Sequence, residues 1–121
     1  MKYMLLIYNR PGFVEGLSEQ ERTDLFAEVG AIMEELTESG ELIGGQGLAD
    51  ATTARTVRLL GGQPAVTDGP FLESKEQFAG YVAVDCETPE RAAEIAASWP
   101  DVRFGGAMEV RAIMDEGGSE M

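Results

Sequence analysis

Apolar residues near the start of the chain occupy both faces of a predicted strand. Within residues 2–8 they fall on both parities, Tyr3, Leu5 and Ile7 on one and Met4, Leu6 and Tyr8 on the other. A strand covered on one face only would carry polar residues at every second position. We therefore expect this strand to be covered on both faces.

A helix is predicted over residues 18–39. Ser18 followed by Glu21 forms a capping box, and Gly40 supplies the left-handed residue that ends many helices. The apolar side chains between them recur at helical spacing, which predicts one buried stripe. This stripe is Leu25, Phe26, Val29, Ile32, Met33 and Leu36.

A second helix is predicted from residue 89. Thr88 is a favourable N-cap, Pro89 is favoured at the first helical position, and Pro100 ends the segment. The buried face is expected to be Ala92, Ala93, Ile95, Ala96 and Trp99. The alanines on that face would allow the helix to approach a sheet closely.

Five further segments are predicted to be strands, namely residues 41–48, 56–60, 63–67, 80–86 and 108–114. Gly61 and Gly62 lie between two of them, as in a tight hairpin. Without that hairpin the order is β-α-β-β-α-β, so we predict an α+β, ferredoxin-like fold with an inserted β-hairpin. Residues 1–115 would form a single domain, and the polar, glycine-rich residues 116–121 a disordered C-terminal tail.

The sheet face that the helices leave bare would still carry apolar residues from 2–8 and 80–86. Apolar patches of that size usually mark an interface. We therefore predict a homodimer in which two sheets pack face to face about a two-fold axis. The alternative is that the loops and the hairpin fold over this face.

Charge narrows the classes of partner. The chain carries 22 acidic and 9 basic residues, a net charge of −13. Such a surface repels phosphate backbones, so direct nucleic-acid binding is not expected. No apolar run approaches the ~18 residues that a membrane helix needs. The lone cysteine, Cys86, allows no intrachain disulfide and fits a reducing cytoplasm.

The residue inventory also bears on metals and cofactors. With no histidine and one cysteine, the chain has no imidazole or thiolate metal site, and we predict no metal and no cofactor. Four acidic residues could attract a hard cation, but we interpret them as a solvated helix face. They are Glu34, Glu35, Glu38 and Glu41.

The segment TDGPFLESKEQFAGY, residues 67–81, holds most of the candidate chemistry. Pro70 would keep Gly69 extended, and Phe71 could then anchor the loop in the core. In one interpretation the polar residues lie at the mouth of the dimer cleft, where Lys75 holds an anionic group. The alternative is a well-made structural loop with a surface ion pair.

Specific roles follow from the first of these interpretations. Asp68 and Glu76 would be the catalytic candidates, each as an acceptor or a base. Arg10, in the loop after the first strand, and the hydroxyl of Tyr81 would join Lys75 as ligand-binding groups.

The longer segment VTDGPFLESKEQFAGYVAVDC resembles the signature of the DGPF proteins, part of the YCII-related family. The resemblance implies a dimeric α+β barrel of two ferredoxin-like subunits. Some relatives are enzymes acting on small ring compounds, with a proposed His-Asp acid-base pair. Of that pair only an aspartate, Asp68, could be present here.

Three functions remain open. The first is a homodimer that binds a small, anionic ligand in a cleft near the DGPF loop. DGPF proteins are commonly encoded beside extracytoplasmic-function sigma factors, so the resemblance also suggests an accessory interaction module for a sigma factor. The third is a cofactor-free enzyme using carboxylate acid-base chemistry on a small ring compound.

Overall fold

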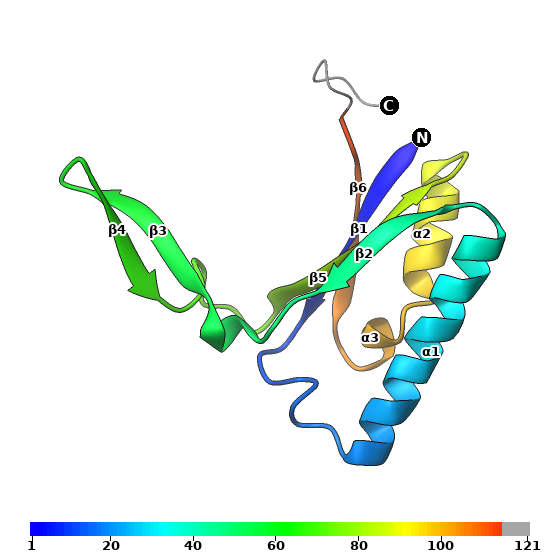
Figure 1. Cartoon of the computed structure of the whole chain (residues 1–121), viewed down its shortest axis with the longest axis horizontal. Helices are drawn as coiled ribbons and strands as arrows, with labels where there is room; N and C mark the ends of the chain where they lie inside the picture. Colours follow the sequence, from blue (N-terminus) through cyan, green and yellow to red (C-terminus); the bar gives the residue numbers. More distant parts are fainter. Residues whose placement is uncertain (115–121) are drawn as a thin grey trace.

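The computed structural model describes residues 1–114, and its elements follow the predicted order (Figure 1). They are β1 (Lys2–Asn9), α1 (Glu19–Glu38), β2 (Leu42–Gly47), the 3₁₀ helix η1 (Ala51–Thr53), β3 (Arg55–Leu60), β4 (Gln63–Asp68), β5 (Gln77–Asp85), α2 (Pro89–Ala97), α3 (Pro100–Arg103) and β6 (Ala107–Ala112). The tail predicted at 116–121 lies outside the described residues.

Four strands form one antiparallel sheet in the order β2-β5-β1-β6. The helices cover one face of this sheet, and β3 and β4 form a separate two-stranded sheet (Figure 1). With the hairpin set aside, this order is that of the split β-α-β-β-α-β arrangement. The predicted ferredoxin-like α+β fold is therefore confirmed.

The predicted capping box of α1 is present. The Ser18 hydroxyl accepts from the Glu21 amide at 3.1 Å, and the Glu21 carboxylate accepts from the Ser18 amide at 2.8 Å. Leu25 and Leu36 are buried as expected, but Phe26 is exposed. The predicted stripe was therefore one residue too wide, because only the positions directly facing the sheet are covered.

The second helix also begins as predicted. The Thr88 side chain accepts from the Arg91 amide at 3.1 Å, and Pro89 is the first helical residue. Ala92, Ile95, Ala96 and Trp99 are buried, whereas Ala93 is exposed and was wrongly assigned to the buried face. The helix α2 ends at Ala97, and Pro100 is the first residue of the short helix α3.

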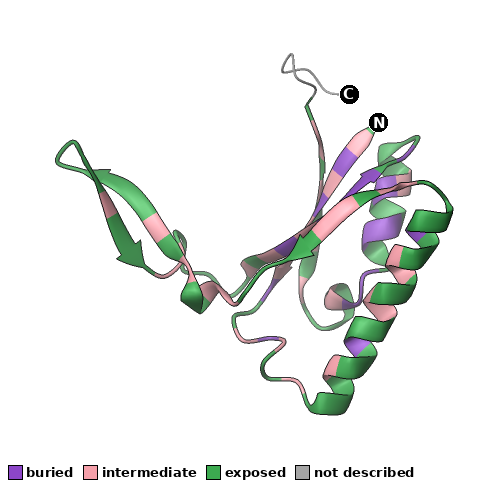
Figure 2. Cartoon of the chain, in the orientation of Figure 1, coloured by how far each residue is buried: buried purple, intermediate pink, exposed green. Residues whose placement is uncertain are grey.

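The core lies between the helices and the central strands. Tyr3 and Leu5 of β1 pair with Val84 and Val82 of β5, and all four side chains are buried among residues of the helices. In Figure 2 the buried positions follow these strands and the facing side of α2. This face of the sheet needs no further cover.

The opposite sheet face, here called the open face, is also apolar at its centre. Met4 pairs with Ala83 and Leu6 pairs with Tyr81, on the parity opposite to Tyr3 and Leu5. The hairpin does not fold over it, because β3 and β4 project away from the sheet (Figure 1). The open face therefore keeps the apolar character that the sequence predicts.

Candidate functional site

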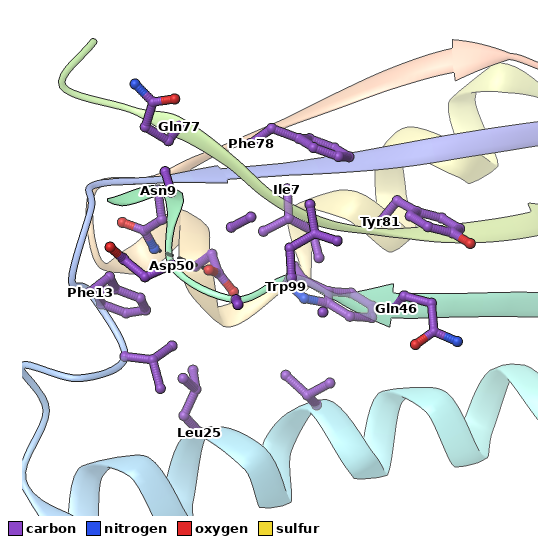
Figure 3. A pocket seen from close by; sticks show the side chains of 18 of the residues that line it. Ile7, Asn9, Phe13, Leu25, Gln46, Asp50, Gln77, Phe78, Tyr81 and Trp99 are labelled. Atoms are coloured by element: carbon purple, nitrogen blue, oxygen red, sulfur yellow. Dashed lines mark hydrogen bonds between the residues drawn. The ribbon is translucent and has the colours of Figure 1, made fainter. Parts of the chain in front are cut away.

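A cavity of about 410 Å³ lies between the N-terminal half of α1 and the β2–β5 side of the sheet (Figure 3). We call it the inner pocket. Its wall is mainly apolar and includes Ile7, Phe13, Leu25, Val29, Met33 and Trp99. Volume and lining are those of a site for a small organic molecule.

The inner pocket exists because β2 lacks side chains where it faces the core. Gly45 pairs with the buried Val82, and Gly47 has the same parity. A Cβ at Gly45 would lie 2.8 Å from the Tyr81 carbonyl oxygen, so glycine allows close approach of β2 and β5 there. At Gly47 a Cβ would meet no heavy atom within 4 Å. Of these two glycines, Gly47 thus leaves open space beside the pocket, and Gly45 permits the close pairing of β2 with β5.

One end of the inner pocket is polar and held by hydrogen bonds. Asn9 is buried, and its side-chain amide donates to the Asp101 carboxylate at 3.0 Å. Its carbonyl oxygen accepts from the Arg10 amide at 2.9 Å. The Arg10 guanidinium lies 4.8 Å from the centre of the Phe13 ring and donates to the Phe104 carbonyl. The loop after β1 is therefore fixed against the pocket.

Asp50 closes the same end from the other side. Its carboxylate accepts from the Thr52 hydroxyl at 2.6 Å and amide at 3.1 Å, and from the Gly12 amide at 2.5 Å. These hydrogen bonds, that of the Thr52 hydroxyl foremost, lower the pKa of Asp50. Asp50 thus joins two loops and is held in its ionised form.

A second hollow, here called the outer cleft, lies where the hairpin leaves the sheet. Its volume is about 890 Å³, and residues 48–51 and 77–78 line both it and the inner pocket. Arg55 and Arg58 of β3 line the cleft, and the ion pairs found among residues 1–114 include neither. The two hollows therefore adjoin, the inner one apolar and the outer one bearing two cations.

The five predicted site residues do not share one hollow. Arg10 lines the inner pocket and Glu76 lines the outer cleft. Tyr81 borders the inner pocket, but it lies on the open-face parity of β5, opposite Leu6. Asp68, the last residue of β4, and Lys75, exposed in the following loop, line neither of these two hollows. The predicted set also omits Arg55 and Arg58, which line the outer cleft. The sequence could have indicated them, because they lie in a nearly neutral segment of a strongly acidic chain.

The DGPF loop is built differently from the prediction. Gly69 has φ +96°, not an extended conformation, and its amide donates to the Ala54 carbonyl at 2.7 Å. Its carbonyl accepts from the Thr56 hydroxyl at 2.9 Å. Phe71 is 64% exposed and lies 5.3 Å from the Arg58 guanidinium, so it does not anchor the loop in the core. The loop is tied to the base of the hairpin instead.

The thiol of Cys86 and the possible metal ligands add no further candidate site. Cys86 is buried, as expected, and burial raises the pKa of its thiol. Within residues 1–114 no group of three His, Cys, Asp or Glu side chains is placed to hold a metal ion. In that same part of the chain no helix has the length and apolar character to cross a membrane.

Comparisons with known proteins agree with the YCII-related resemblance of the sequence. The family model described as the YCII-related domain matches residues 1–116. The chain is also similar to "Uncharacterized protein R00369" of Rhizobium meliloti (strain 1021), with 31% identity over 112 residues. That alignment covers 92% of this chain and 90% of the relative. The chain thus belongs to the YCII-related family.

Proposed function

We propose that the protein is a homodimer that binds a small organic anion across the two adjoining hollows. The apolar body of the ligand would occupy the inner pocket, beside Leu25 and Trp99. Its anionic group would point into the outer cleft, toward Arg55 and Arg58. The observation that carries this proposal is the cavity beside β2, where Gly47 leaves open space and Gly45 lets β2 approach β5 closely.

The homodimer part of the proposal rests on the open face. Met4, Leu6, Ala83 and Tyr81 form an apolar centre on it, and burying such a surface against a second copy is favourable. A two-fold contact between two such faces is self-complementary, because each copy presents the same patch.

Binding is favoured over acid-base catalysis by the state of Asp50 and Asp101, two of the three carboxylates that line the inner pocket. Asp50 is engaged by three hydrogen bonds and its pKa is lowered, which makes it a weak proton acceptor near pH 7. Asp101 is occupied by the Asn9 amide. Both carboxylates therefore serve to shape the pocket.

Filling the pocket tests the proposal. In Gly47→Leu the new side chain has free space, because no heavy atom lies within 4 Å of the added Cβ. Gly30→Leu on α1 is a matched control, since its Cβ is equally unobstructed and Gly30 does not line the inner pocket. Native mass spectrometry of gently purified protein would report a retained molecule in wild type and Gly30→Leu, and none in Gly47→Leu.

A second measurement covers a ligand lost in purification. Thermal shifts with a panel of aromatic and aliphatic carboxylic acids should be positive for wild type and Gly30→Leu, and absent for Gly47→Leu. A wild-type protein that retains nothing and responds to no acid in the panel would contradict the proposal. An equal response from Gly47→Leu would place any binding outside the inner pocket.

A further inference from the structure

The β3–β4 hairpin, residues 55–68, has one apolar and one polar face, and we call it the arm. On one face Val57 lies opposite Val66 and Leu59 opposite Pro64, with the Arg55–Asp68 pair at the base of the arm. On the other face Thr56 lies opposite Thr67 and Arg58 opposite Ala65, with Leu60 opposite Gln63 beside the turn. Such alternation is the pattern of a two-stranded sheet that buries one side.

The apolar face of the arm is not buried by residues 1–114. Val57, Leu59 and Val66 are 63%, 70% and 61% exposed, so no other element among residues 1–114 covers them. Figure 2 shows the arm exposed along most of its length, away from the sheet and helices. A hairpin of two strands alone is at best marginally stable in water, and it gains stability by packing its apolar face. The apolar face of the arm therefore remains available to a surface other than residues 1–114.

Charge points to a second copy as that surface. The arm contains Arg55 and Arg58 against Asp68, a net charge of +1 in a chain of −13. The rest of each copy is thus strongly acidic. Two such bodies repel each other, but the arm of one is attracted to the body of the other.

The position of the arm agrees with this occupant. The arm leaves the sheet at the outer cleft, whose walls include Tyr8 and Phe78 of the sheet as well as Val57 and Arg58 of the arm. The arm and the sheet diverge from that point (Figure 1). A second copy placed on the open face would lie between them, and it would supply the missing wall of the outer cleft.

We propose that the arm is a dimer clasp: the apolar face of Val57, Leu59 and Val66 packs against a second copy of the chain, which also closes the outer cleft. If two copies exchange their arms about a two-fold axis, the apolar face of each arm is buried against the other copy. This inference rests on the homodimer of the proposed function, but not on the ligand.

Sedimentation equilibrium over a dilution series tests the clasp. The variant Val57→Thr/Leu59→Thr/Val66→Thr keeps residues suited to strands and changes only exposed positions, so the subunit should fold with an unchanged circular dichroism spectrum. The expected result is a dimer dissociation constant raised by about tenfold or more. Val102→Thr, at an exposed site on α3, is the control and should leave it unchanged.

Cross-linking identifies what the arm touches. A photoreactive phenylalanine at Leu59 is placed in an equal mixture of isotopically heavy and light chains. Cross-linked peptides joining heavy to light chains are expected, and they would show that the arm reaches a second copy. Links confined to one isotope, or a triple variant that dimerises as tightly as wild type, would overturn the clasp. A wild type that stays monomeric at all concentrations would overturn both the dimer and the clasp, whereas ligand binding is scored separately.

Discussion

The ion pair between Glu41 and Arg91 gives a prediction of stability with a defined pH dependence. Glu41 follows α1, and Arg91 lies in the first turn of α2; their two hydrogen bonds measure 2.9 Å (Nε to Oε2) and 2.8 Å (Nη2 to Oε1). Ser39 donates to the same carboxylate at 2.8 Å. The Arg91 guanidinium, followed by the Ser39 hydroxyl, lowers the pKa of Glu41 from 4.5 to about 2.

The free energy follows from that shift. One pKa unit corresponds to about 1.4 kcal/mol, so the full shift would contribute about 3.4 kcal/mol to the free energy of unfolding. The Arg91 side chain is 39% exposed, and solvent screening reduces the contribution of such a pair to about 1 kcal/mol. Because the folded-state pKa is depressed, this contribution is complete above pH 4.5 and is lost as the pH falls through about 2.

Glu41→Gln should therefore lower the free energy of unfolding by about 1 kcal/mol at pH 7, and the loss should shrink below pH 4.5. Urea denaturation followed by circular dichroism at pH 7, 4 and 3 measures it. Glu94→Gln is the control, since Glu94 also pairs with Arg91, at 2.6 Å, but is largely exposed and should matter little. The reasoning fails if the two variants are equally stable at pH 7, or if the cost of Glu41→Gln is the same at every pH.

Two further predictions concern the β2–β5 pair and the outer cleft. Gly80→Ala should destabilise the fold and speed hydrogen exchange in β2, because the added Cβ would lie 2.6 Å from the Gln46 carbonyl oxygen and Gly80 has φ +156°. Gly44→Ala is the matched control: its added Cβ would meet no heavy atom within 4 Å, so it should behave as wild type. Arg58→Gln should reduce the thermal shift produced by any carboxylic acid that binds, whereas Lys75→Gln should not, because Lys75 lines neither hollow. A thermal shift lost in Lys75→Gln alone would instead support the anion-binding role predicted for Lys75 from the sequence.

Local signals in the sequence were sufficient for the elements and their order. Ser18 and Thr88 mark helix starts through hydrogen bonds to amides three residues away, and Gly61 and Gly62 mark the hairpin by their positive φ angles of +59° and +80°. Each depends only on neighbours along the chain. The fold followed because these elements combine in few ways.

The inner pocket could not be predicted because it depends on register. The pairing of β2 with β5 shifts between Leu42 and Gly44, and this irregularity places Gly45 and Gly47 on the core-facing side. A shift of one residue would reverse every side chain of the strand. Nothing in the sequence of β2 alone fixes where that irregularity falls.

The side chains of the DGPF loop illustrate the same limit. Phe71 is large and apolar, which predicts burial, yet it is 64% exposed and lies beside Arg58 of the hairpin. Lys75 and Asp68 were grouped by nearness in sequence, but only the path of the chain decides which hollow a loop residue reaches.

The arm forms a sheet of its own and shares no strand with the sheet that builds the core. Its length and surface can therefore change without altering the register of β1, β2, β5 and β6. Two related chains in one cell could keep the same body and diverge only in their arms. Each would then select its own kind and reject mixed pairs, so a single hairpin could govern which family members assemble together.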